Sequence, residues 1–405
     1  MSHASVVSRI THEAGPREPA VSDGHAWWQE LPTGFASSSE RFELGAADRI
    51  KVHATAASDV VLRTLGASLV ASLALPVGYH PLALRRALVD EELYGRIAES
   101  GDPDRFFERP PRRVLVSRRR ARLPLFRPGS GACEDVRFES PFIPVNPRER
   151  RRYRAHRGNR YAFARHWRHD GPARPTVIAV HGFSADLYHL NEWFFAIPWL
   201  YREGYDVMLV TLPFHGKRQT RLSPFSGHGF FAGGASRINE ALAQAVFDLR
   251  IFMDHLLEDL GVPRVGITGV SLGGFTSALL AAVEPRLSFA IPNVPVTSIA
   301  DLVLEWEPIG TLLRAALKLS HRDVRDARHL LAVSCPLSYR PRLPKERLMI
   351  IGGVGDRLAP PTHARLLWDH WNRCRIHWFP GSHLIHLDRG SYFRQMRLFL
   401  DAIEF

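Results

Sequence analysis

The feature of this chain most suited to chemistry is a serine between two glycines. Residues 265–275 read Val-Gly-Ile-Thr-Gly-Val-Ser-Leu-Gly-Gly-Phe, which places Ser271 between Gly269 and Gly273. An apolar run typical of a buried strand precedes the pattern, and a small-residue run typical of a helix follows it. A serine on so sharp a turn is strained and exposes its hydroxyl, and larger side chains at the two glycines would collide with neighbouring elements. The pattern predicts a nucleophile; the alternative is a glycine-rich turn with a buried serine.

A nucleophilic serine needs a general base, an acid that orients the base, and N–H donors for the oxyanion. Residues of these kinds follow apolar runs elsewhere in the chain. His181-Gly182-Phe183 ends such a run upstream, Asp356 follows another downstream, and His383 ends a third. The chain order Ser271, Asp356, His383 therefore indicates acyl chemistry through a covalent intermediate.

These segments, in this order, resemble the α/β-hydrolase superfamily from about Asp135 to the C-terminus. The matched segments look like the nucleophile elbow (269–273), the oxyanion loop (181–183), the turn after the fourth strand (211–218), the acid loop (355–361) and the histidine loop (381–383). The resemblance implies an α/β fold with a mostly parallel central sheet flanked by helices, and a serine esterase or lipase activity. A narrower resemblance is to the branch typified by α/β-hydrolase domain-containing protein 18.

The resemblance also implies the roles of the site residues. His383 takes the proton of Ser271, and Asp356 holds the imidazole in the required tautomer. The backbone N–H groups of Phe183 and Leu272 bind the oxyanion. This chemistry requires no metal and no organic cofactor, so we expect neither.

Some neighbouring residues compete for these roles. His386 is an alternative base, but a Gly-Ser-His run directly after a strand favours His383. Asp301 is an alternative acid, because some relatives place the acid after the preceding strand. Three further residues are expected at the substrate pocket: His181, His215 and Trp306.

Three classes of function remain open. The first is a hydrolase of a small-molecule or lipid acyl ester, the second is an acyltransferase that uses the same acyl-enzyme, and the third is a catalytically silent binding protein of the same fold. The intact set of Ser271, Asp356 and His383 argues against the third. The sequence leaves the oligomeric state open.

Composition fits a sizeable enzyme. A chain of 405 residues with 45% hydrophobic content can bury one large core. Its three cysteines are odd in number, sparse and without metal-ligand spacing, which fits a reducing cytoplasm. Residues 1–15 lack the apolar segment of a secretory signal, so we expect a cytoplasmic protein.

Composition also divides the chain. We predict a flexible tail at 1–45, a helical or irregular extension at 46–134, and the hydrolase domain at 135–405 with a lid-like insertion at about 298–344. Within the extension, no Asp, Glu, Lys or Arg occurs between Arg63 and Arg85, and Pro76, Gly78 and Pro81 interrupt the apolar run. A buried or docked helix explains this run, and the alternatives are an interfacial membrane helix and a true membrane span.

The formal net charge is +12, and only four of the 53 basic residues are lysines. Arginines cluster at 118–122 and 148–154, but no nucleic-acid-binding motif accompanies them, so we expect no specific nucleic-acid partner. The run at 160–167 alternates like an edge strand with a basic solvent face. An anionic lipid surface could also attract these arginines. With the apolar stretch, they would then form an anchor that weakens as salt rises.

Overall fold

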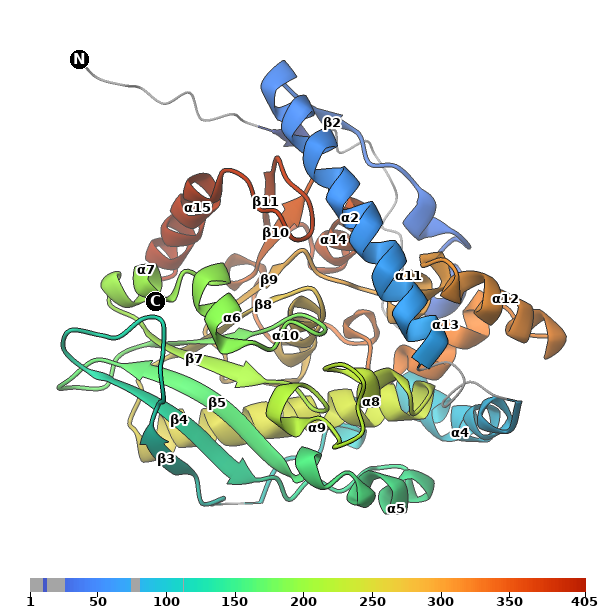
Figure 1. The fold of residues 1–405 in the computed structure, drawn as a ribbon, viewed down its shortest axis with the longest axis horizontal. Coiled ribbons are helices and arrows are strands. Elements are labelled where there is room, and N and C mark those ends of the chain that lie inside the picture. Colours follow the sequence, from blue (N-terminus) through green and yellow to red (C-terminus); the bar gives the residue numbers. More distant parts are fainter. Residues whose placement is uncertain (1–9, 13–25, 74–80, 112) are drawn as a thin grey trace.

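A nine-stranded sheet forms the centre of the molecule (Figure 1). The computed structural model describes residues 10–12, 26–73, 81–111 and 113–405. The strand order across the sheet is β11-β10-β9-β8-β6-β7-β5-β4-β3. The strands are β3 Ser117–Arg120, β4 Ala132–Glu139, β5 Tyr161–Arg168, β6 Thr176–Val180, β7 Asp206–Thr211, β8 Val265–Val270, β9 Ala290–Asn293, β10 Met349–Gly353 and β11 Arg375–Phe379.

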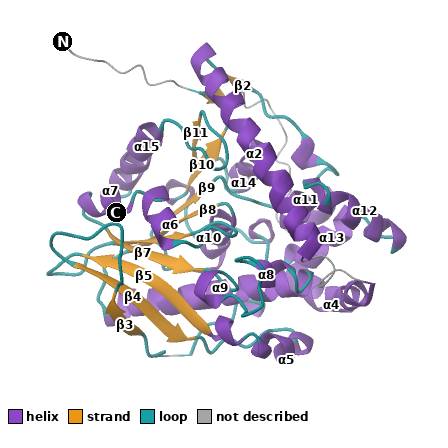
Figure 2. Cartoon of the chain, in the orientation of Figure 1, coloured by secondary structure: helices purple, strands orange, loops and turns teal. Residues whose placement is uncertain are grey.

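The sheet is parallel from β7 through β6, β8, β9 and β10 to β11, and β5, β4 and β3 continue it in antiparallel fashion. Strands β6 and β8 are buried along their whole length, as expected for parallel strands covered on both faces. Figure 2 shows helices surrounding the sheet. The predicted fold class is confirmed.

Alternate residues of the central strands enter two separate cores. On β6, Ile178 and Val180 face one core, and Val177 and Ala179 face the other. The first core also contains α9 (Ala235–Asp254) and α10 (Leu272–Val283). The second core contains α7 (Ile197–Arg202) and α15 (Arg389–Ala402). Because side chains alternate along a strand, helices on both faces are needed to cover the sheet.

The remaining helices lie around this frame, and three of them form the insertion between β9 and β10. The insertion consists of α11 (Ile299–Glu305), α12 (Ile309–Leu319) and α13 (Val324–Ala332). The others are α1 Trp27–Glu30, α2 Ala46–Leu73, α4 Pro81–Glu99, α5 Pro147–Ala155, α6 Tyr188–Phe194, α8 His228–Phe231 and α14 Pro361–His370. The two-residue strands β1 (Thr11–His12) and β2 (Phe42–Glu43) pair separately.

The prediction of an edge strand at 160–167 is wrong. Strand β5 pairs with β7 on one side and with β4 on the other. Its Arg165 is buried, with Nε 2.8 Å from Asp135 Oδ1 and the guanidinium over the ring of Tyr188. The edge belongs to β3, whose residues are all exposed. The alternation within one segment cannot show that a further hairpin extends the sheet beyond it.

The N-terminal region packs on the hydrolase domain. The indole of Trp27 donates to Ser338 Oγ at 2.8 Å, and Trp28 stacks on His329 of α13. Helix α2 crosses one side of the molecule next to α11 and α12, far from β3 in this view (Figure 1). Within the predicted apolar stretch, Pro76 and Gly78 lie outside the described residues. The domain boundaries themselves stay a prediction.

By length and composition, α2 could cross a membrane. It has 28 residues, and its most apolar window has a mean hydropathy of 1.3 and is 24% buried. An apolar helix packed on a soluble protein meets the same criteria.

Candidate active site

Ser271 stands alone between β8 and α10 in a strained backbone conformation. Its φ is 55° and its ψ is −113°, a region that costs about 1–3 kcal/mol for a residue with a side chain. A Cβ at Gly269 would collide with the carbonyl of Gly273, and one at Gly273 would collide with the carbonyl of Val180. The two glycines therefore allow strand and helix to approach closely enough to form the turn, and Ser271 is only partly buried there.

His383 and Asp356 form a hydrogen-bonded pair beside this turn. His383 Nδ1 donates to Asp356 Oδ2 at 2.7 Å, and both side chains are buried. The other carboxylate oxygen accepts from the backbone N–H groups of Leu358 (2.9 Å) and Ala359 (2.8 Å). These bonds fix the carboxylate in orientation. Because Nδ1 is occupied, Nε2 is the nitrogen left to act as a base.

The electrostatic environment favours a charged imidazole at His383. Burial by itself would lower the pKa of His383, but the charge of Asp356 and its hydrogen bond oppose this effect, and the charge of Asp59 adds to them. The resulting pKa lies above the ordinary value of 6.5. A base with a raised pKa accepts a proton from a hydroxyl more readily.

His386 has a different environment from His383. Its Nε2 donates to the carbonyl of His383 at 3.0 Å, and its ring packs on Phe379 at 4.4 Å between centroids. Burial lowers its pKa to about 3, so it stays neutral. These contacts suit a residue that supports the loop of His383.

Asp301, the alternative acid, is engaged elsewhere. Its carboxylate lies 2.6 Å from the guanidinium of Arg328 and accepts from Ser298 Oγ at 2.5 Å. Among the described residues, no hydrogen bond joins it to His383. Its position favours a structural role within the insertion.

Ser271 and His383 line one apolar cavity of about 60 Å³. They are its two polar members among the described lining residues. Its walls come from the oxyanion loop, α2, α8, α10, the insertion and the acid loop. The full lining is Val70, Phe183, Phe231, Ser271, Leu272, Val296, Ile299, Leu302, Val303, Trp306, Ile309, Leu358, Ala359 and His383. The cavity can therefore hold an apolar group next to the serine hydroxyl.

The backbone around Ser271 suits an oxyanion. Helix α10 begins at Leu272, so this N–H has no carbonyl within the helix to bond to and lies at its positive end. A Cβ at Gly182 would lie 3.4 Å from the Cβ of Ser271, so the loop that carries Phe183 runs directly against the turn. His181 orders this loop, since its Nδ1 donates to the carbonyl of Gly182 at 2.7 Å.

Of the three residues expected at the pocket, Trp306 lines the cavity, and its indole donates to the carbonyl of Leu358 at 3.1 Å. His181 and His215 are buried behind the lining, with ring centroids 5.2 Å apart. His215 Nδ1 donates to the carbonyl of Pro213, and burial lowers its pKa to about 3. Both histidines thus support loops that border the site.

No group of three or more histidine, cysteine, aspartate or glutamate residues in the described part of the chain is arranged to hold a metal ion. The three cysteines are free and buried. Sequence reasoning missed one polar neighbour of the site, Asp59 of α2, whose hydrogen bonds reach the loops of Asp356 and His383. Its only signal was an acid within a long apolar run, with Arg63 as the one other charged side chain between residues 52 and 84.

Comparisons with known proteins concern the family and the fold of this chain. Residues 175–288 match the family described as alpha/beta hydrolase fold. Over 315 residues the chain is 30% identical to an uncharacterized protein of Mycobacterium tuberculosis (strain CDC 1551 / Oshkosh), covering 72% of this chain and 68% of that protein. The chain belongs to the α/β-hydrolase family. The narrower resemblance to one branch stays a prediction.

Solved structures show the same fold. Acetyl xylan esterase 1 from Thermoanaerobacterium sp. JW/SL YS485 has a TM-score of 0.51 at 18% identity, covering 77% of this chain and 93% of that one. Acetyl xylan esterase from Paenibacillus sp. R4 has a TM-score of 0.53 at 14% identity, covering 77% and 94%. At such identities the likeness concerns the fold.

Proposed function

We propose that this protein is a serine esterase that cleaves carboxylic esters with an apolar acyl group. One observation carries the proposal: Ser271 and His383 line the same apolar cavity, while Asp356 occupies the other nitrogen of His383. This arrangement supports acyl-enzyme chemistry, in which a serine nucleophile, a histidine base and an orienting carboxylate act together.

In the first half-reaction, Ser271 Oγ attacks the ester carbonyl carbon while its proton passes to His383 Nε2. The negative carbonyl oxygen is held by the N–H groups of Leu272 and Phe183, each worth about 10²–10³ in rate in comparable enzymes. The C–O bond then breaks, and the alcohol leaves with the proton from His383.

In the second half-reaction, water replaces the alcohol. It gives a proton to His383 Nε2 and attacks the acyl carbon. The bond to Ser271 Oγ breaks, the carboxylic acid leaves, and the serine recovers its proton from His383. Asp356 stays ionised throughout and stabilises the imidazolium.

The apolar lining supports a small-molecule or lipid acyl ester as substrate. The names of the two structural neighbours, both esterases, agree with an ester. Two experiments test the proposal: labelling of Ser271 by a fluorophosphonate, and hydrolysis of p-nitrophenyl esters of increasing acyl length. We expect labelling and hydrolysis by the wild type and neither by Ser271→Ala with an intact fold. Residual hydrolysis above a few per cent in the variant would contradict the assignment.

An acyltransferase would use the same acyl-enzyme and exclude water. Product analysis with a competing alcohol separates the two: transfer to the alcohol in preference to water would favour the acyltransferase. A protein that neither reacts with fluorophosphonate nor turns over any ester would be the silent binding protein.

We also propose that the enzyme is cytoplasmic and contacts a membrane surface peripherally through α2. Three unpaired cysteines support a reducing compartment. Support for membrane contact comes from α2, where six large apolar side chains among those described are exposed: Ile50, Val60, Val61, Leu62, Leu65 and Leu73. Exposed apolar side chains of this kind suit the boundary between lipid headgroups and acyl chains.

A further inference from the structure

We infer that Asp59 of α2 is a positioning residue of the active site, holding the loops of Asp356 and His383 in register. This inference rests on the proposed function and assigns part of the catalytic arrangement to the N-terminal extension, outside the hydrolase domain.

The first observation is a shared hydrogen-bond acceptor. Asp59 Oδ2 accepts from the backbone N–H of His383 at 2.8 Å and from that of Arg357 at 3.0 Å. Arg357 directly follows Asp356, so one oxygen atom joins the backbones of the acid loop and the histidine loop. Asp59 is fully buried, and hydrogen bonds to a charged acceptor in such surroundings are strong.

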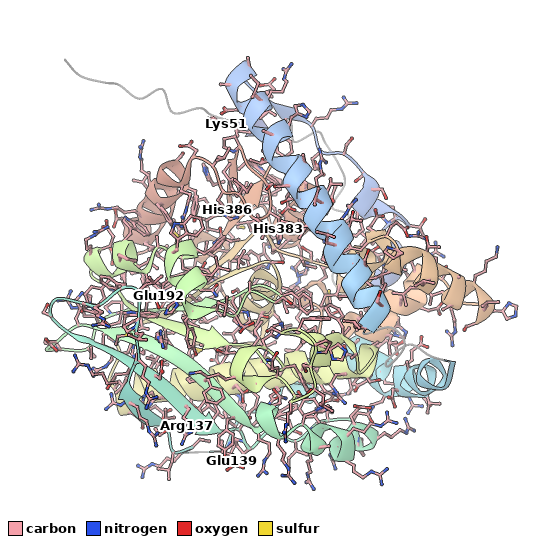
Figure 3. All side chains as sticks on the ribbon, viewed as in Figure 1. Lys51, Arg137, Glu139, Glu192, His383 and His386 are labelled. Atoms are coloured by element: carbon pink, nitrogen blue, oxygen red, sulfur yellow. The ribbon has the colours of Figure 1, made fainter. Side chains whose placement is uncertain are left out.

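The second observation is that α2 contacts the same loops on both sides of Asp59. About two turns before Asp59, the carbonyl of Val52 lies close to Gly355, so that a Cβ added at Gly355 would stand 3.0 Å from the Val52 oxygen. One turn after it, the guanidinium of Arg63 donates to the carbonyl of Arg357 at 3.0 Å. Figure 3 shows His383 beside the middle of α2.

The third observation concerns charge. No ion pair to Asp59 occurs among the described residues, and its Oδ1 has no hydrogen-bond partner there. Burying a carboxylate without a cation is costly. The cost is offset if the charge faces a group that becomes positive, and His383 becomes an imidazolium during each half-reaction. Asp59 accordingly adds to the effects that raise the pKa of His383.

Among the residues that the structure describes, four titratable groups face His383 from its own loop and from the neighbouring elements. Asp356 lies on the acid loop and Asp59 on α2. His386 of its own loop and His363 of α14 also interact with its charge, and burial lowers the pKa of each, to about 3 and about 4. Both histidines stay neutral near pH 7, so within this set the groups that raise the pKa of His383 are Asp356 and Asp59.

The experiment compares Asp59→Asn and Asp59→Ala in the full chain. Asparagine keeps an acceptor for the two N–H groups but loses the charge, whereas alanine loses both. The matched control is Asp90→Asn, a buried aspartate of α4 that bonds to Ser236 and Arg148 away from the site. The measurement is the rate at which a fluorophosphonate labels Ser271, as a function of pH, together with kcat and KM for an ester.

We expect Asp59→Asn to slow labelling about tenfold on the plateau and to move its acidic limb down by about one pH unit, because the imidazolium loses a stabilising charge. Asp59→Ala should be slower still, because two buried N–H groups lose their acceptor. KM should change little, since Asp59 does not line the cavity. Asp90→Asn should label within about twofold of the wild type, because the partners of Asp90, Ser236 and Arg148, lie away from the active site.

Two results would overturn the inference. The first is a folded Asp59→Ala variant that is labelled at the wild-type rate. The second is an Asp59 variant whose labelling rate falls no further than that of Asp90→Asn. If the wild type is not labelled at all, the proposed function fails, and a second measurement still decides the role of Asp59. The proton shared by His383 and Asp356 gives a low-field NMR signal whose pH dependence reports the pKa of His383. An unchanged titration in Asp59→Asn would refute the inference, and a titration moved to lower pH would support it.

Discussion

At the scale of single residues, hydrogen bonds separate two histidines that stand three positions apart. His383 directs Nδ1 to Asp356 and faces the cavity, whereas His386 bonds to the carbonyl of His383 and packs on Phe379. Their assignment as base and support depends on these contacts and not on residue type.

The first prediction concerns this pair. His383→Ala and Asp356→Asn should each lower kcat by several orders of magnitude, because the base or its orientation is lost. His386→Ala should cost about tenfold or less, since it removes only a support of the loop. Steady-state kinetics on one p-nitrophenyl ester gives the comparison. Equal damage from His386→Ala and His383→Ala would show that the base is misassigned.

The second prediction is a pH profile. His383 must be neutral to accept a proton, and its pKa is raised above the ordinary 6.5. Activity should therefore be lost as pH falls through a midpoint above 6.5, measured as kcat/KM against pH. His386→Ala should leave this midpoint in place, because the pKa of His386 is lowered to about 3. A midpoint clearly below 6.5 in the wild type would contradict the prediction.

At the scale of elements, a buried arginine links the insertion between β9 and β10 to the N-terminal segment through hydrogen bonds. Arg328 of α13 pairs with Asp301 of α11 at 2.6 Å, and its guanidinium also donates to the carbonyls of Leu31 (2.5 Å) and Pro32 (2.9 Å). Arg328 is fully buried. One side chain of α13 thus bonds both to α11 and to the N-terminal segment at residues 31–32.

The third prediction is that Arg328→Ala lowers the free energy of unfolding by about 3–5 kcal/mol, because it leaves the Asp301 carboxylate buried without its cation. Arg160→Ala is the control, since its pair with Glu139 is exposed and should contribute about 1 kcal/mol or less. Urea titration of both variants tests this. Pairing Arg328→Met with Asp301→Leu should recover part of the loss, because an apolar pair avoids the buried charge. Recovery should be incomplete, because the carbonyls of Leu31 and Pro32 still lack their donor.

At the scale of the whole molecule, the apolar helix and the arginine clusters are separate features. Figure 1 shows α2 on one side, and β3 and α5, which carry the clusters, on the far side in this view. Their proximity in sequence therefore does not bring them side by side in the fold (Figure 1). We expect that contact of α2 with a membrane would be largely apolar.

The fourth prediction follows from this separation. The wild type should co-sediment with phospholipid vesicles, and Val61→Asp combined with Leu65→Asp should weaken binding at least about tenfold, because each buried aliphatic side chain contributes about 1.5–3 kcal/mol. Replacing neutral by anionic lipid in the vesicles should change the binding less than this double substitution does. Leu222→Asp, at an exposed apolar residue outside α2, is the control. Wild-type protein that stays in the supernatant with both vesicle types would show that α2 is only a docked helix.

Much of the fold and part of the candidate site were predictable from local sequence. The turn at Ser271 depends on Gly269 and Gly273, whose role is set by contacts within a few residues and with one neighbouring strand. The parallel strands can be recognised in the sequence as short apolar runs, because both of their faces are buried. Such features are encoded by residue type at short range, and one chain segment is enough to reveal them.

The tertiary structure decided what depends on segments far apart in the chain. Strand β5 is interior because β3 and β4 extend the sheet beyond it, and the alternation of β5 itself is the same in either position. Asp59 meets His383 across 324 residues of sequence. A lone aspartate in an apolar helix has no local partner to reveal its role, so only the packing of α2 over the catalytic loops determines which backbone N–H groups it binds.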